Sequence, residues 1–218
     1  MSKIKLRELA ISLRKQNLSY SQIKERVNVP KSTLSSWLHP YPLSPENIKR
    51  LRAHSEIRIE KFRHTMQNKR KERLEKIYNI EKNKMHKLTK HERLIAGLAL
   101  YWGEGRKTDW ATTSITNTDP QILQFFIKWL KSVHNIKPTD MRVALQLYSD
   151  MDIQKEITYW SDVLKLPTTQ FIKPYIKSSI SSRINHKGAF GHGTCAIMVY
   201  GVELKQKIMM QLKIMAEM

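Results

Sequence analysis

The spacing of apolar residues separates helical stretches of the chain from strand-like stretches. Apolar positions recur three and four residues apart, the period of an amphipathic helix, over 3–15, 120–134, 153–164 and 202–216. Strand-favouring or alternating residues occupy 110–117, 142–148, 171–178 and 194–200. In the second half of the chain, helices and strands therefore follow one another, which predicts an α+β fold.

The first half of the chain has a different pattern, in which no strand is expected. Two short helices are predicted over 21–27 and 31–38, on either side of the helix-breaking sequence Asn28-Val29-Pro30. Ser44-Pro45-Glu46 then reads as the start of a new helix, with a serine cap and proline in the first turn. The stretch 46–88 is charged and poor in helix breakers, so it predicts one long helix or two.

The charge of the chain favours a polyanionic partner. There are 39 Lys and Arg against 19 Asp and Glu, a formal net charge of +20, and 23 of these cations with only 8 acids lie in 1–90. Such an excess repels itself unless a polyanion binds, and nucleic acid is the expected one. The helical stretch 46–88 is then either a solvated spacer or a helix that tracks a phosphate backbone, and both interpretations can hold together.

The stretch 97–105 carries the most specific chemical signal. It reads GLALYWGEG: an apolar helical run with the small residues Ala99 and Gly103 one turn apart, which ends in an acid and a glycine, Glu104-Gly105. This stretch resembles the LAGLIDADG motif of homing endonucleases. It departs from that motif in several places, among them Trp102, which stands where an aspartate is usual. The alternative is a buried helix whose small residues serve ordinary packing.

The resemblance covers about 91–217 and implies a fold, a partner and a reaction. The family domain is a curved antiparallel sheet with helices on one face, and SITNTDPQILQFFIKWL also looks like the strand and helix that follow the motif. With one motif per chain, the resemblance implies a homodimer in which Ala99 and Gly103 form the interface. Glu104, with Gly105, would hold Mg²⁺ for site-specific cleavage of double-stranded DNA, because a hard carboxylate suits this cation.

Further residues are assigned by type and by place in the expected sheet. The candidates for supporting catalytic groups are Lys173, Gln146 and Lys187. The candidates for DNA contacts in this domain are Arg106, Lys107 and Arg142. Solvated side chains without such a role are the alternative for the lysines.

The stretch 18–38, LSYSQIKERVNVPKSTLSSWL, resembles the helix-turn-helix of resolvases and small bacterial regulators. The expected core residues are Ile23, Val29, Leu34, Trp37 and Leu38. The residues expected to face DNA are Lys31, Ser32, Thr33, Ser35 and Ser36. The predicted organisation is a helix-turn-helix domain at 1–43, a long basic helical linker at 44–90 and a LAGLIDADG-like endonuclease domain at 91–218.

Several alternatives remain beside the endonuclease hypothesis. A non-cleaving, sequence-specific transcriptional regulator built on the same two domains is the main rival, and a recombinase accessory protein is a third class. His186, His192 and Cys195 gather near three glycines, but their spacing matches no established zinc pattern. With one cysteine, no signal-like start and no long apolar run, we expect a cytoplasmic protein without a disulfide framework or a membrane partner.

Overall fold

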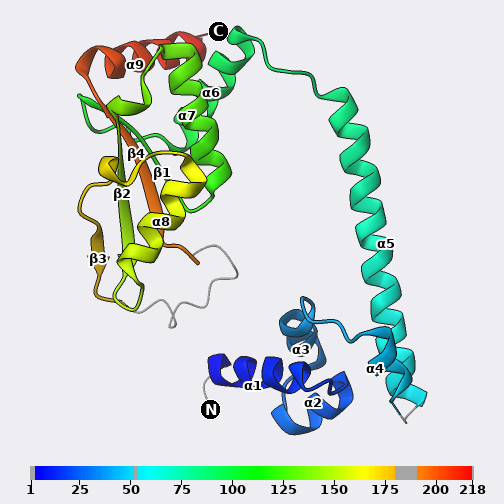
Figure 1. The fold of residues 1–218 in the computed structure, drawn as a ribbon. Coiled ribbons are helices and arrows are strands. Elements are labelled where there is room, and N and C mark those ends of the chain that lie inside the picture. The colour runs from blue at the N-terminus through cyan, green and yellow to red at the C-terminus, as the bar shows by residue number, and fades with distance from the viewer. Residues whose placement is uncertain (1–2, 52–53, 180–190, 218) are drawn as a thin grey trace. The chain divides into compact units, whose positions relative to one another are not determined.

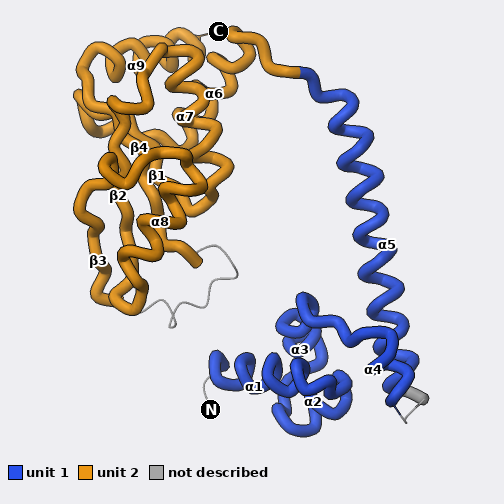
Figure 2. Tube along the Cα trace, in the orientation of Figure 1, with its two compact units in different colours: residues 1–86 blue, residues 87–218 orange. Residues whose placement is uncertain are grey.

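The computed structural model describes residues 3–51, 54–179 and 191–217 (Figure 1). The chain divides into two compact units, Met1–His86 and Lys87–Met218, which Figure 2 shows in different colours. Each unit has its own cluster of buried apolar residues. No helix in the described part of the chain is both long and apolar enough to cross a membrane.

The first unit consists of helices. They are α1 (Lys3–Lys15), α2 (Tyr20–Val27), α3 (Lys31–Leu38), α4 (Pro45–Lys49) and α5 (His54–Lys84). The expected bounds of α1 and α3 are confirmed, α2 begins one residue earlier than expected, and 46–88 divides into two helices. Ile23, Leu34 and Leu38 are buried, and Val29 and Trp37 pack against them, as the apolar pattern predicts.

Local hydrogen bonds fix where α2 begins and ends. The Ser19 hydroxyl accepts from the backbone N–H of Gln22, and the Gln22 side chain accepts from the Ser19 N–H, which together form a capping box. Asn28 follows α2 in the left-handed conformation, with φ 49°, which asparagine tolerates better than most residues. This turn redirects the chain into α3.

A buried ion pair joins α1 to α5. The Arg14 guanidinium binds the Glu60 carboxylate through two bonds, of 3.0 and 2.7 Å, and both side chains are almost fully buried. Arg14 also donates to the carbonyl oxygens of Leu18 and Tyr41, and Glu60 accepts from the N–H of Tyr20. The start of α5 is therefore part of the core of the first unit.

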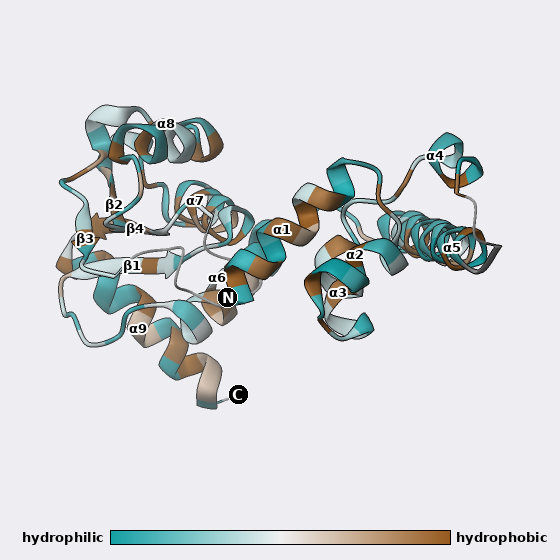
Figure 3. Cartoon of the chain, turned by 90° about the horizontal axis from the view of Figure 1, so that it is seen from below, coloured by the Kyte–Doolittle hydropathy of each residue, from teal (hydrophilic) through white to brown (hydrophobic). Residues whose placement is uncertain are grey.

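The stretch 44–90, expected as a linker, contains two environments. Its first part contributes the buried residues Ile48 and Glu60, whereas every residue of α5 from 68 to 84 is exposed. Most of α5 has the colour of hydrophilic residues in Figure 3. The exposed C-terminal turns of α5 fit a solvated helix. Its first turns pack against the core of the first unit.

The second unit is an α+β domain. Its elements are α6 (Lys90–Glu104), β1 (Thr112–Asn117), α7 (Pro120–His134), η1 (Pro138–Asp140), β2 (Met141–Tyr148), α8 (Ile153–Leu164), η2 (Thr168–Gln170), β3 (Tyr175–Lys177), β4 (Thr194–Tyr200) and α9 (Val202–Glu217). The strands form one sheet in the order β1-β4-β2-β3. The expected helices 120–134 and 153–164 and the expected strand 194–200 are confirmed.

One expected strand and one expected pairing are wrong. Within 171–178, only Tyr175–Lys177 forms a strand, because Pro174 has no N–H to donate to a ladder. The sheet is also not wholly antiparallel, since β3 runs parallel to β2. The crossover helix α8 lies between these two strands, and a strand that returns after such a crossover pairs in parallel. The pairs β1-β4 and β4-β2 are antiparallel.

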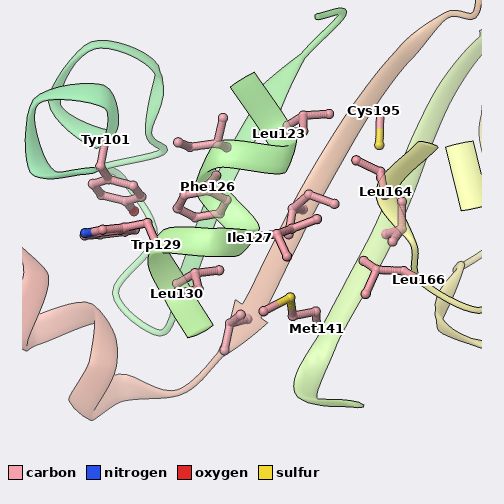
Figure 4. Packing of buried hydrophobic residues seen from close by; sticks show 14 of the residues in the cluster. Tyr101, Leu123, Phe126, Ile127, Trp129, Leu130, Met141, Leu164, Leu166 and Cys195 are labelled. Carbon is pink, nitrogen blue, oxygen red and sulfur yellow. The ribbon is translucent and has the colours of Figure 1, made fainter. Parts of the chain in front are cut away.

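The motif helix α6 packs closely on α7. Tyr101, Phe126 and Trp129 form an aromatic cluster with ring centroids 5.7 to 6.4 Å apart (Figure 4). A Cβ atom on Gly97 would lie 2.1 Å from the Trp129 indole, so only glycine fits at this crossing. Gly97 is thus explained by packing within the unit.

We predict that Glu60→Gln destabilises the first unit. The substitution keeps the shape of the side chain but leaves the buried Arg14 guanidinium without its counter-charge, which costs about 3 kcal/mol. Hydrogen exchange of the full chain, followed by mass spectrometry, should show amides of α1 and α2 exchanging about a hundredfold faster. Glu72→Gln, at an exposed position of α5, is the control. Equal protection in both variants would show that the ion pair does not stabilise this unit.

Candidate functional site

The candidate site lies at the C-terminal end of α6. This helix starts with a capping box, in which the Thr89 hydroxyl accepts from the Glu92 N–H and the Glu92 carboxylate accepts from the Thr89 N–H. It ends at Glu104, because Gly105 leaves the helix in an extended conformation while its N–H still donates to the Tyr101 carbonyl oxygen. The motif's acid is therefore the last residue of the helix.

Gly105 is required by a close approach and not by an unusual backbone angle. A Cβ atom at this position would lie 2.4 Å from the Tyr101 carbonyl oxygen. Gly105 is buried and forms a β-bridge with Ile115 of the neighbouring strand. The acid-glycine pair thus has a structural reason: the glycine lets the chain turn from the helix directly onto the edge of the sheet. A contact between Gly105 and a metal stays a prediction.

The exposed side of α6 carries no charge between Ile95 and Gly103. Its exposed residues there are Ile95, Ala99, Trp102 and Gly103, whereas Gly97, Leu98 and Tyr101 face the interior. Ile95 and Trp102 are 39% and 47% exposed, and a Cβ atom on Gly103 would meet nothing within 4 Å. We call these four exposed residues the outer stripe. The two residues expected at a dimer interface, Ala99 and Gly103, both belong to it.

Glu104 is exposed and has one polar partner. The Asn117 Nδ2 atom donates to Glu104 Oε2 over 3.3 Å. The other end of the Asn117 amide accepts from the Asp119 N–H over 2.9 Å, which orients the amide so that its N–H₂ group faces Glu104. Asn117 was not among the residues expected at the site, because its role depends on β1 ending beside α6. Only its position at the end of a predicted strand pointed to it.

The donor set fits a hard cation in part. Glu104 supplies an accessible carboxylate, the kind of ligand that Mg²⁺ prefers. Within the described part of the chain, no group of three or more His, Cys, Asp or Glu side chains could hold a metal together. The remaining ligands of a cation at Glu104 would therefore be phosphate oxygens, waters or groups of a second copy.

The supporting residues expected from the sequence do not gather at Glu104 within one copy. Gln146 is exposed on β2, which is separated from β1 by β4, so its strand lies two spacings, about 10 Å, from β1. It also points to the opposite face of the sheet from Asn117, whose row continues through Cys195 and Leu145. Lys173 is exposed and follows Ile172, which bonds to Val143 on the far side of β2. Lys187 lies outside the described residues.

The three basic residues expected to contact DNA have different environments. Arg106 and Lys107 are exposed directly after the acid-glycine pair. The Arg142 guanidinium donates instead to the carbonyl oxygens of Thr139 and Met141, over 2.8 and 2.9 Å. Arg142 is therefore partly engaged in holding its own turn.

A buried lysine holds the loop after the site. Lys205 of α9 is 2% exposed, and its ammonium donates to the Tyr101 hydroxyl over 2.7 Å and to the Arg106 carbonyl oxygen. The Tyr101 hydroxyl donates to the same carbonyl oxygen. Burial raises the pKa of Tyr101 to about 12, so this hydroxyl remains a donor at neutral pH, and burial lowers the pKa of Lys205.

The helix α3 of the first unit presents most of the polar residues expected there. Lys31, Ser32 and Ser36 are exposed and Thr33 is partly exposed. Ser35 is engaged, because its hydroxyl accepts from Arg63 Nη1 of α5 over 2.7 Å. The Arg63 guanidinium also lies over the Tyr20 ring, 3.8 Å from its centroid. A linker residue thus reaches the surface that was assigned to DNA.

The histidine and cysteine residues considered for zinc occupy different environments. Cys195 is fully buried in the core of the second unit, and burial raises the pKa of its thiol. His192 binds Glu156 through Nδ1 over 2.9 Å, and its ring stacks on Tyr159. His186 lies outside the described residues. The contacts of His192 and the burial of Cys195 account for both residues as parts of the packed second unit.

We predict that Lys205→Met loosens the loop 105–112. Methionine fills similar space but removes a donor from the Arg106 carbonyl and from the Tyr101 hydroxyl, which costs about 1 kcal/mol or more. Amides of this loop should exchange about fivefold faster or more by mass spectrometry. Lys207→Met, on an exposed face of the same helix, is the control. Unchanged exchange in Lys205→Met would mean that the lysine does not hold the loop.

Comparisons of the chain with protein-family models, with curated proteins and with solved structures found no match. The function is therefore argued from the residues at the end of α6 and from the helices of the first unit.

Proposed function

We propose that the protein is a homodimeric, Mg²⁺-dependent endonuclease that cuts double-stranded DNA at specific sites. The observation that carries this proposal is the exposed Glu104 carboxylate at the end of a helix whose outer stripe is uncharged. In a chain of formal charge +20, an accessible acid next to Arg106 and Lys107 favours a cation that bridges the acid to phosphate.

The chain's own residues would act at the site as follows. Glu104 would hold the cation through its carboxylate, and the Asn117 amide would orient that carboxylate. When bound, Mg²⁺ supplies charge stabilisation at the phosphate and lowers the pKa of the attacking water. Arg106 and Lys107 bind phosphate groups beside the scissile bond.

Cleavage of both strands needs two such sites, which we assign to two copies of the chain. The outer stripe on α6 offers the contact surface for the second copy, because it is uncharged and its small residues Ala99 and Gly103 let two helices approach closely. Isologous pairing along this helix would bring the two Glu104 residues together near the two-fold axis. Each carboxylate would then serve one strand.

The first unit would add affinity and sequence recognition. The exposed residues Lys31, Ser32 and Ser36 at and after the start of α3 have the types that contact phosphates and base edges. The left-handed Asn28 between α2 and α3, together with these exposed side chains, supports the proposed helix-turn-helix role of the first unit. Recognition by two copies would make the target site roughly palindromic.

A non-cleaving DNA-binding regulator is the second candidate. The observation in its favour is that Glu104 already has a polar partner, the Asn117 amide. A carboxylate that only caps the end of β1 would need no cation. Incubation of the full chain with a genomic or randomised DNA library, with and without Mg²⁺, followed by sequencing of ends, separates the two. Discrete double-strand ends that require Mg²⁺ support the enzyme.

We predict that Glu104→Gln abolishes cleavage and keeps DNA binding. The amide has the shape of the acid but lacks its charge, so the stabilisation by the cation, worth several kcal/mol, is lost, and cleavage falls about a hundredfold or more. Affinity for DNA in metal-free buffer should stay equal or rise slightly, because a negative charge is removed. Glu203→Gln, at an exposed acid of α9, is the control. Cleavage by Glu104→Gln at the wild-type rate would refute the catalytic assignment.

We predict that Gly103→Leu dissociates the dimer. The leucine has free space around it within one copy, so the fold of the unit should persist, but its side chain would separate two helices that touch along the outer stripe. Overpacking of such a contact costs about 1–3 kcal/mol. Sedimentation velocity should show monomers, whereas Ala216→Leu, at an exposed position of α9, should sediment as wild type. A Gly103→Leu dimer as tight as wild type would exclude this surface.

A further inference from the structure

The loop between α6 and β1 is held in place at several points of its backbone. At its start, the Arg106 N–H donates to the Ser114 carbonyl oxygen over 3.0 Å, and the Arg106 carbonyl oxygen accepts from Lys205 and Tyr101. At its end, the Ala111 carbonyl oxygen accepts from the Gly201 N–H over 2.8 Å. Both ends of the loop are therefore fixed to the sheet and to α9.

The acid of this loop is used inside the loop. Asp109 Oδ1 accepts from the backbone N–H groups of Ala111 and Thr112, each over 2.9 Å. These bonds, with that to Ala111 the strongest influence, lower the pKa of Asp109, so the carboxylate is charged at neutral pH. The cations Arg106 and Lys107 stay exposed. Arg106 Nη1 also lies 4.0 Å from Asp109 Oδ2, and the arginine side chain remains 60% exposed. The loop thus uses its acid mainly for its own backbone and leaves Arg106 and Lys107 accessible.

Trp110 lies in the middle of this fixed loop and is 74% exposed, more than any other large apolar side chain in the described part of the chain. A loop that is merely irregular would gain several kcal/mol by burying an indole. Here the residues on both sides of Trp110 are fixed by hydrogen bonds: the Asp109 carboxylate accepts from backbone N–H groups, and the Ala111 carbonyl oxygen accepts from the Gly201 N–H. The loop therefore holds the tryptophan away from the core. Such a rigid, exposed aromatic group is suited to contact a ligand.

A second exposed aromatic residue lies at the same end of the sheet. Tyr200, at the end of β4, is 61% exposed and pairs with Thr112, the first residue of β1. The residue after it, Gly201, is the donor to Ala111. The backbones that carry Trp110 and Tyr200 are therefore joined directly.

We propose that Trp110 is a DNA-binding residue that stacks on or wedges between bases of the duplex, with Arg106 and Lys107 on the adjacent phosphates. Aromatic faces beside cations recognise nucleic acid, because every base offers a face for stacking and every phosphate a charge. This inference rests on the proposed binding of DNA and is independent of cleavage. Trp110 precedes β1, whereas Glu104 contacts its last residue, Asn117. A duplex that contacts both Trp110 and Glu104 would lie along the length of β1, about 20 Å or roughly six base pairs.

The test measures tryptophan fluorescence and affinity with sonicated mixed-sequence duplex DNA at low salt. Stacking quenches an indole, so wild type should show a loss of emission that Trp110→Phe lacks, although four other tryptophans remain. Trp110→Ala should weaken binding about tenfold, which is within the range for loss of one stacked base, and Trp110→Phe by less. The salt dependence of binding should not change, because no charge is removed. Met210→Ala, which removes an exposed apolar side chain of α9, should behave as wild type.

The possible outcomes separate this inference from the proposed function. If wild type binds DNA and both Trp110 variants bind with equal affinity and equal quenching, Trp110 does not contact bases, while the proposed function stands. If wild type binds no duplex DNA under these conditions, the proposed function fails and this inference fails with it. Loss of folding in Trp110→Ala would appear as altered circular dichroism. In that case the Trp110→Phe variant tests the inference alone: quenching equal to that of wild type would refute base stacking by Trp110.

Discussion

The position of the candidate site in the second unit depends on one buried side chain, that of Lys205. Its ammonium is held by the Tyr101 hydroxyl and the Arg106 carbonyl oxygen, so α9 is joined to the end of α6 and to the loop that follows. Burial of an ammonium is costly unless polar groups receive its hydrogens. Because these groups come from the motif helix and from the residue after Gly105, the position of Glu104 is coupled to the C-terminal helix. The packing of Tyr101 against α7 then fixes the other side of α6.

Periodicity was sufficient to predict most of the elements and not the way in which they pair. The helices Pro120–His134 and Ile153–Leu164 have continuous amphipathic patterns and begin after the capping residues Asp119 and Asp152. Their bounds could therefore be predicted from local signals. The parallel pairing of Tyr175–Lys177 could not, since it follows from the crossover through α8. The expected antiparallel sheet was right for three strands and wrong for this one.

The site was predicted in the same uneven way. The acid and the exposed small residues lie within one helix, and Gly105 follows it directly, so their relation is set by local geometry that the sequence pattern predicted correctly. Asn117 was missed because its contact with Glu104 arises only when β1 packs beside the end of that helix. Gln146 and Lys173 were chosen by residue type, and the strand order sets them two or more strands away. Within a sheet, alternation fixes the face of a residue, but only the strand order fixes its neighbours.

The two candidate functions make opposite use of one carboxylate. In a regulator, the hydrogen bond from Asn117 would be the whole role of Glu104, and exposure of the acid beside Arg106 and Lys107 would lower affinity for DNA unless a cation intervened. In an endonuclease, the same bond orients a ligand whose remaining oxygen contacts lie open to solvent and phosphate. The buried Arg14–Glu60 pair shows the contrast, because there both carboxylate oxygens accept hydrogen bonds and no ligand position remains. The single hydrogen bond to Glu104 thus leaves room for the proposed metal ligand role.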